Sequence, residues 1–287
     1  MKWLPVQVDD AWMETVWRDG AARLDVEPQA TPTPSASGNV IGGPVTHRGE
    51  TAWLRVAPFI ADAMDLEPWR GTRDAAVLTG IRKPELLDST EWTTGPDPVP
   101  IPVCAELMTY ASDPVATPGD QYLERPVDLS PGWLAGLRTS LDALAGQPTT
   151  REIWGNRPDR YANLFHAFGW SLPADVVPRW GSTEHLDLHW GNITVPNLMI
   201  LDWEHWGVNV AGYGAARLYC TALAVPTVAA QIFSLFADVL DSPSGRYAIL
   251  ANAAGILSDF THYRDEAGLC PALHRVARTL LEPRPGG

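Results

Sequence analysis

The spacing of apolar residues changes along the chain. Apolar positions 12, 13, 16 and 17 follow the period of a helix and predict one over residues 9–24. Short apolar runs then predict a strand–turn–strand over residues 44–47 and 51–57, and a buried strand at 101–110. Beyond residue 128 the spacing predicts helices over residues 132–145, 159–168, 212–223, 227–240, 246–260 and 271–281. The pattern therefore indicates an α+β chain with most of its predicted strands in the first half.

One β-ribbon is predicted within the helical half. Two apolar runs, residues 193–195 and 198–201, flank Pro196-Asn197, a dipeptide that favours a turn. A hairpin folded about residue 197 places Asn192 opposite Asp202. Asp187 lies five residues before Asn192, in a loop that can return to the same end of the ribbon. The ribbon therefore predicts one convergent group of polar side chains.

This group suits the chemistry of phosphate and a divalent cation. Mg²⁺ prefers oxygen ligands, which Asn192 and Asp202 offer, and substrate phosphates complete its coordination. Asp187 can receive a proton from an attacking hydroxyl, and His185 joins this catalytic set by tying the loop with hydrogen bonds. The simpler alternatives are that Asp187 caps a loop and that Asn192 and Asp202 share a hydrogen bond at the hairpin end.

These residues also carry a resemblance to a known family. The pattern HxDxxxxN at residues 185–192, followed by Asp202 after an apolar strand, resembles the catalytic and metal-binding segments of aminoglycoside-phosphotransferase-like kinases. The resemblance implies a two-lobed protein-kinase-like fold, with an N-terminal lobe at residues 1–106 and a helical C-terminal lobe at 107–287. It also implies ATP and Mg²⁺ as cofactors.

The longer run HLDLHWGN … LDWEHWG … GYGAARLY is similar to a group of actinobacterial phosphotransferase-like proteins. The chain departs from the pattern of that group at two positions. Leu186 stands where the pattern has glycine, and Gly214 stands where it has aspartate. A bulky residue at 186 is expected to alter the packing of the loop beside Asp187.

The resemblance also implies nucleotide contacts in the first lobe. Residues 37–43 (SGNVIGG), with Ser37 and Gly38 at their start, are expected either to cover phosphate through backbone N–H groups or to form a plain loop. Arg55 stands in the strand that usually carries a phosphate-binding lysine, although a structural arginine is the alternative. Its acidic partner is expected from the following helix, as Glu67 or Asp74.

The predicted strand 101–110 is expected to leave into an exposed connection between the lobes. Backbone groups from Glu106 to Met108 would then meet the adenine ring. Pro- and Gly-rich segments precede and follow this strand, which supports a boundary there.

The amino-acid composition limits the classes of partner that this chain is expected to bind. The net charge of −13 argues against a nucleic-acid partner and is compatible with a cationic substrate. No apolar run is long enough to span a membrane. Acidic residues in the first segment, together with three scattered cysteines, predict a cytoplasmic protein with reduced thiols. The expected partner is thus a small molecule or a small peptide.

Two alternatives to a phosphotransferase stay open. Arg55, Leu186 and the irregular glycine loop are compatible with a catalytically degenerate kinase-like protein that binds a nucleotide or partner without transfer. A zinc hydrolase is the other, because a strand at residues 185–189 would present His185, Asp187 and His189 on one face.

Overall fold

The computed structural model of this chain describes residues 9–35, 38–59, 66–95, 100–153, 158–260 and 268–282, with backbone alone at 66–68 and 260. The chain divides into two compact units. The first unit comprises residues 1–77 and 84–112, and the second comprises residues 78–83 and 113–287. The boundary expected after residue 106 falls inside a strand of the first unit, and the units divide after Ser112.

The first unit is built on an antiparallel sheet. Its strands are β1 (Glu27–Pro28), β2 (Thr33–Pro34), β3 (Ile41–His47), β4 (Glu50–Pro58), β5 (Leu86–Thr94) and β6 (Ile101–Thr109). The sheet has the order β1-β3-β4-β6-β5, and β2 also pairs with β3. The helical elements of this unit are α1 (Asp10–Arg23), α2 (Leu66–Asp74) and the 3₁₀ helix η1 (Ala75–Val77).

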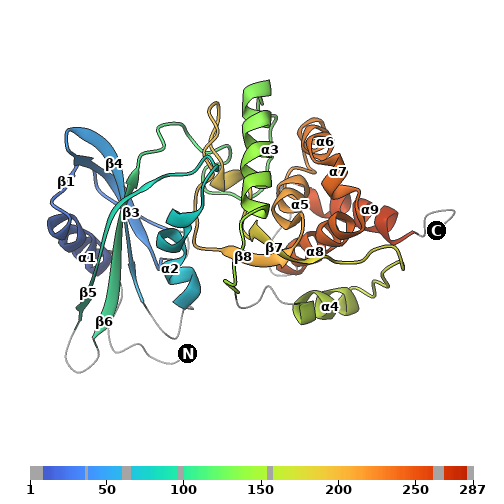
Figure 1. The fold of residues 1–287 in the computed structure, drawn as a ribbon, viewed down its shortest axis with the longest axis horizontal. Coiled ribbons are helices and arrows are strands. Elements are labelled where there is room, and N and C mark those ends of the chain that lie inside the picture. Colours follow the sequence, from blue (N-terminus) through green and yellow to red (C-terminus); the bar gives the residue numbers. More distant parts are fainter. Residues whose placement is uncertain are drawn as a thin grey trace. The chain divides into compact units, whose positions relative to one another are not determined.

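Helix α1 packs against this sheet (Figure 1). The apolar spacing predicted this helix, and Asp9 caps its first turn. The side chain of Trp17 is fully buried, and its indole N–H donates to the carbonyl of Leu54 in β4 at 3.0 Å. Because a buried indole N–H needs an acceptor, this bond fixes the helix on the sheet.

One expectation about the strands is corrected, and one is confirmed. Strand β3 begins at Ile41, so Gly42 and Gly43 lie in the sheet rather than in a glycine-rich loop. Strand β6 continues to Thr109, with β4 on one side and β5 on the other. Strand β6 therefore ends one residue before the strand predicted at residues 101–110.

The second unit is mainly helical. Its helices are α3 (Pro131–Ala145), α4 (Pro158–Ala167), α5 (Tyr213–Cys220), α6 (Pro226–Leu235), α7 (Ala237–Leu240), α8 (Pro243–Phe260) and α9 (Leu269–Leu281). Helix α8 packs against α4, α5 and α9 in this unit (Figure 1). A sheet-bearing unit followed by a helical unit confirms the α+β class.

The second unit also contains short elements that the apolar pattern did not reveal. Strands β7 (Trp180–His185) and β8 (Trp206–Val210) form an antiparallel pair, and η2 (Trp190–Asn192) is a single 3₁₀ turn. The helix predicted at residues 227–240 is divided into α6 and α7 at Phe236, whose backbone is not helical. The Phe236 side chain is buried at this break.

Helix α3 anchors the predicted ribbon. Ser130 caps the helix by accepting the Trp133 N–H at 3.1 Å. The Trp133 indole N–H donates to the carbonyl of Thr194 at 2.9 Å, and its ring stacks on Trp190 with centroids 6.2 Å apart. Two buried tryptophans thus tie α3 to the segment that contains the candidate site.

The six-residue segment 78–83 joins the second unit through backbone bonds. The Arg82 N–H donates to Ser140 Oγ at 3.1 Å, and the Ile200 N–H donates to the Arg82 carbonyl at 2.8 Å. No helix in the described ranges is both long and apolar enough to cross a membrane. Cys104 and Cys220 are buried thiols.

Candidate active site

Strands β7 and β8 bring the two ends of the predicted catalytic segment together. His185 pairs with Trp206 in the ladder, and the Leu186 N–H donates to the His205 carbonyl at 2.8 Å. The Leu186 side chain is buried, so the residue that departs from the family pattern packs in the interior. Asp187 follows at once, where the chain leaves the strand pair.

The predicted hairpin exists, but its predicted register was wrong by one residue. The Leu201 N–H donates to the Asn192 carbonyl at 2.8 Å, so Asn192 faces Leu201 rather than Asp202. The Thr194 N–H donates to the Met199 carbonyl at 3.0 Å. An even number of residues separates Thr194 from Met199, so the centre of the turn falls between two residues instead of on position 197.

His185 is fully buried and bonded to backbone on both sides of its ring. Nε2 lies 3.0 Å from the carbonyl of Leu201, and Nδ1 accepts the Asp187 N–H at 3.3 Å. These partners require the tautomer that carries its proton on Nε2. Burial lowers the pKa of His185 to about 4, so the ring is neutral near pH 7. His185 therefore orients the loop around Asp187.

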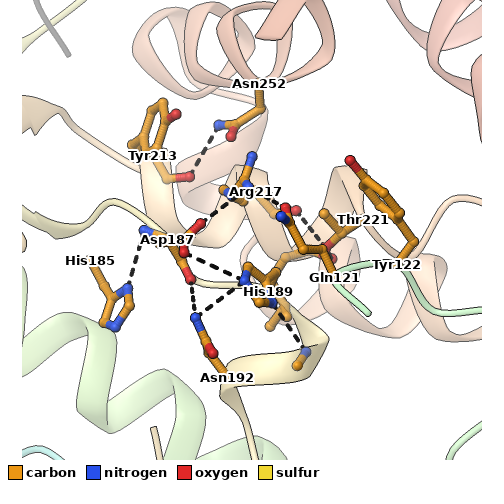
Figure 2. Close-up of polar contacts among 12 residues, drawn as sticks. Gln121, Tyr122, His185, Asp187, His189, Asn192, Tyr213, Arg217, Thr221 and Asn252 are labelled. Carbon is orange, nitrogen blue, oxygen red and sulfur yellow. Dashed lines mark hydrogen bonds and ion pairs between the residues drawn. The ribbon is translucent and has the colours of Figure 1, made fainter. Parts of the chain in front are cut away.

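Asp187 lies between a guanidinium and a second histidine (Figure 2). Its Oδ1 is 3.2 Å from Arg217 Nη2, and its Oδ2 is 3.5 Å from His189 Nε2. Burial alone would raise the pKa of Asp187, but the His189 ring and the Arg217 charge outweigh burial and hold the pKa far below its usual range. The carboxylate is ionised and still 31% exposed, so it is available to a ligand.

Asn192 is oriented by Asp187. Its Nδ2 donates to the Asp187 main-chain carbonyl at 3.0 Å (Figure 2). A carbonyl can only accept, so the NH₂ group faces Asp187 and the amide oxygen faces elsewhere. The same nitrogen lies 3.2 Å from His189 Nε2. Asn192 therefore keeps an oxygen that can bind a cation.

Asp202 joins this network through its neighbour in the chain. Leu201 donates its N–H to Asn192 and places its carbonyl beside the His185 ring. Asp202 itself is exposed and has a left-handed backbone with φ of 57°. Left-handed backbone at a non-glycine residue is uncommon and is concentrated at functional sites. Residues 185, 187 and 192 thus share one hydrogen-bond network with Leu201, and Asp202 follows Leu201 in the chain.

The geometry needed for a zinc hydrolase is not present. The zinc hypothesis requires a strand over residues 185–189 that presents alternate side chains on one face. Strand β7 ends at His185, so residues 186–189 do not form that strand. The Nε2 proton of His185 points to a carbonyl, and the Nδ1 of His189 accepts the Gly191 N–H at 3.1 Å. Among the described residues no three His, Cys, Asp or Glu side chains are grouped to hold a metal ion.

Arg55 and Glu106, two predicted nucleotide contacts in the first unit, form a buried ion pair. They are cross-strand partners in β4 and β6, with Nη1 and Oε2 2.5 Å apart. Arg55 is 6% exposed and Glu106 is fully buried. An acid on β6 thus pairs with Arg55, whereas Asp74 at the end of α2 is exposed and the Glu67 side chain lies outside the described residues.

The other predicted nucleotide contacts are Ser37, Gly38 and Met108. Ser37 lies outside the described residues. Gly38 is exposed in a turn where its N–H donates to the Ser35 carbonyl at 2.9 Å. Met108 pairs with Trp53 of β4 and Leu86 of β5 in the sheet. Nucleotide binding by these residues stays a prediction.

Comparison with known proteins identifies the fold. No protein-family model matches this chain, and no curated protein matches its sequence. Solved structures do match. Amicoumacin kinase hAmiN, in complex with AMP-PNP, Ca²⁺ and Ami, aligns over 96% of this chain and 94% of its own, with a TM-score of 0.54 and 14% identity.

A thermostable mutant of aminoglycoside phosphotransferase APH(4)-Ia, in a ternary complex with ADP and hygromycin B, aligns over 95% of this chain and 99% of its own. The TM-score is 0.54 and the identity is 13%. This chain has the protein-kinase-like fold of the aminoglycoside phosphotransferases. The fold class predicted from residues 185–202 is therefore confirmed.

Two residues of this candidate site were missed by the sequence analysis. Arg217, on α5, reaches Asp187 from thirty residues further along the chain. Glu184, the residue before His185, binds the start of the same helix. Neither follows a local spacing rule, because each contact depends on how α5 packs on β7. A glutamate one residue before the HxD pattern is the signal that the sequence offers.

Proposed function

We propose that this protein is a cytoplasmic phosphotransferase that uses ATP and Mg²⁺ to phosphorylate a hydroxyl group. Its acceptor is a small polar or cationic molecule, such as an amino sugar or another metabolite, or a small peptide. The observation that carries the proposal is the single network around Asp187, in which Asn192 and the Asp202 segment share hydrogen bonds with its loop. The kinase-like fold supports the same assignment.

In this mechanism Asp187 orients the acceptor hydroxyl. A bond forms between the acceptor oxygen and the γ-phosphorus while the bond from that phosphorus to the bridging oxygen breaks, and ADP leaves. The hydroxyl proton passes to the Asp187 carboxylate. Because Arg217 and His189 lower the pKa of Asp187, the carboxylate is a weak base. It acts mainly by orientation, which suits a loose transition state in which the proton moves late.

The donor set fits Mg²⁺. Asn192 offers an amide oxygen, since its nitrogen is bonded to the Asp187 carbonyl, and the exposed Asp202 offers a carboxylate. Hard cations take such oxygen ligands, and Mg²⁺ is usually bound by one or two side chains together with substrate phosphates. When bound, the ion would neutralise charge on the phosphate oxygens.

The first prediction concerns Asp187→Asn. We expect ATP-dependent phosphorylation of an amino-sugar and small-peptide panel to fall about 10²- to 10⁴-fold in kcat, because the amide cannot accept the hydroxyl proton. Phosphate transfer would be followed by ³¹P NMR, and folding by circular dichroism.

Asp159→Asn is the matched control, because Asp159 is an exposed acid in the first turn of α4. It should keep the kcat of the unaltered protein. If Asp187→Asn and Asp202→Asn both retain full turnover, the proposed mechanism is wrong.

One observation favours a second function, that of a nucleotide- or partner-binding protein without transfer. Arg55, in the position expected for a phosphate-binding lysine, is buried against Glu106. Thermal unfolding with ATP, ADP and Mg²⁺ would separate the two functions. A rise in unfolding temperature with nucleotide, but no transfer to any acceptor, would support the binding protein.

A further inference from the structure

Glu184 is a buried carboxylate that joins β7 to the start of α5. Its Oε1 accepts the Gly212 N–H at 2.9 Å and the Ser182 hydroxyl at 2.8 Å, and its Oε2 accepts the Gly214 N–H at 3.0 Å. The residue is 7% exposed. An amide N–H at the start of a helix has no partner within the helix, so a carboxylate is a strong acceptor there.

The space beside Gly214 is closed to a larger side chain. A Cβ on Gly214 would lie 3.2 Å from the His185 carbonyl oxygen and 3.5 Å from Glu184 Oε2. A carboxylate at position 214 would therefore meet the Glu184 carboxylate in a buried place, where like charges repel strongly. Glycine at 214 and glutamate at 184 are in this way complementary.

Helix α5 carries Arg217, one turn beyond Gly214. Arg217 is paired with Asp187 at 3.2 Å and with Gln121 Oε1 at 2.7 Å (Figure 2). Glu184 itself precedes Asp187 by three residues. The Glu184 bonds thus link the strand that leads to Asp187 with the helix that supplies its guanidinium partner.

We propose that Glu184 is a positioning residue that holds α5, and with it Arg217, against the Asp187 carboxylate. The expected effect of Glu184 on turnover rests on the proposed phosphotransferase function. Its expected effect on the position of Arg217 does not. The two backbone N–H groups bond to different oxygens of the carboxylate, and an amide at position 184 has only one oxygen.

The first test reads the position of Arg217 directly. Arg217 Nε is buried, so its N–H resonance in protein labelled with ¹⁵N-arginine should be shifted and protected from water. Loss of that resonance in Arg217→Lys assigns it. We expect Glu184→Gln to shift or broaden the resonance, because one N–H of α5 loses its acceptor.

Ser182→Ala is the matched control for the loss of a buried hydrogen bond. It removes one bond to Glu184 and leaves both N–H bonds of α5 intact. The Arg217 resonance should therefore stay in place even if thermal stability falls. An unchanged Arg217 resonance in folded Glu184→Gln would overturn the proposal.

The second test is a double-mutant cycle. Gly214→Asp should lower kcat at least about tenfold more than Gly214→Ala, which adds only the Cβ. In the Glu184→Gln background the same Asp substitution should cost much less, because an amide can donate to the new carboxylate. Equal costs of Gly214→Asp in both backgrounds would contradict the complementarity of the two positions.

Activity separates positioning from substrate binding. In Glu184→Gln we expect kcat to fall about tenfold while the KM for ATP changes less than about threefold, because the residue acts through Asp187. If the unaltered protein transfers no phosphate, the proposed function fails, and the Arg217 resonance still decides the role of Glu184. If Glu184→Gln does not fold, comparison of Gly214→Asp with Gly214→Ala by the same resonance decides it.

Discussion

At the scale of single residues, the uncharged ring of His185 holds the loop around Asp187 in place. Its ring donates to the Leu201 carbonyl and accepts the Asp187 N–H, so a second proton would break the latter bond. Burial opposes that proton, Asp187 favours it, and His189 and His205 oppose it. The balance keeps the loop intact as long as the ring stays uncharged.

This neutrality predicts an acid-sensitive fold. The unfolded histidine gains a proton near pH 6.5, whereas the folded ring does so only near pH 4. Between these values the unfolded state binds more protons, so the free energy of unfolding should fall as the pH is lowered. His185→Gln should reduce this slope by up to about 1.4 kcal/mol per pH unit, as measured by urea unfolding across this window.

His166→Gln is the control for this measurement, because His166 is an exposed histidine on α4. It should leave the slope as in the unaltered protein. Identical slopes for His185→Gln and the unaltered protein would mean that His185 does not set the acid sensitivity.

Residue spacing predicted part of the site. Asp187 and Asn192 are five residues apart, and the bond between the Asn192 side chain and the Asp187 carbonyl is local. The register opposite Asn192 depended on the length of the turn, which composition does not specify. The roles of Arg217 and Glu184 could not be predicted from the sequence, because their contacts depend on tertiary packing of α5.

At the scale of elements, the turn η2 is held between two parts of the second unit. The Trp190 indole N–H donates to the Leu218 carbonyl of α5 at 3.2 Å, and the Thr117 N–H donates to the Trp190 carbonyl at 3.3 Å. A Cβ on Gly191 would lie 2.3 Å from the Asp120 carbonyl oxygen. The turn that presents Asn192 therefore fits only with glycine at 191.

Gly191→Ala should displace this turn. We expect the free energy of unfolding to drop by about 1–3 kcal/mol, since the obstacle is backbone and cannot rotate away. The half-saturating Mg²⁺ concentration for turnover should rise, because Asn192 moves with the turn. Chemical denaturation and Mg²⁺ titration of turnover would measure both effects.

Gly255→Ala is the matched control. Gly255 lies within α8, and no atom is within 4 Å of a Cβ placed there. Alanine should stabilise the helix by about 1 kcal/mol and leave the Mg²⁺ dependence unchanged. Destabilisation at both glycines would mean that close packing at Gly191 is not the cause.

Elements with local signals were predicted well. Caps at Asp9 and Ser130 mark α1 and α3, and apolar spacing finds the later helices. Strand β7 (WGSTEH) is mostly polar and β8 (WGVNV) has only five residues, so neither alternates in the way of a half-buried strand. The two strands can be recognised only from their pairing, which forms when the fold brings residues 180–185 and 206–210 side by side.

At the scale of the whole molecule, the net charge of −13 gives the protein a negative field. For a cationic acceptor this field raises the encounter rate, and salt screens it. We expect kcat/KM for a cationic acceptor to fall several-fold between about 0.02 M and about 0.3 M ionic strength. A neutral acceptor of similar size is the control and should show little change; equal salt dependence would exclude steering by charge.

Residues 78–83 affect how the second unit can be expressed by itself. A fragment that starts at Asp113 would lack the strip of backbone that bonds to Ser140 and Ile200. Ile200 pairs with Ile193 in the ribbon that contains Asn192, so such a truncation would remove the acceptor of a ribbon amide. Anyone who wishes to express the helical half alone would need to supply that hexapeptide, fused or in trans.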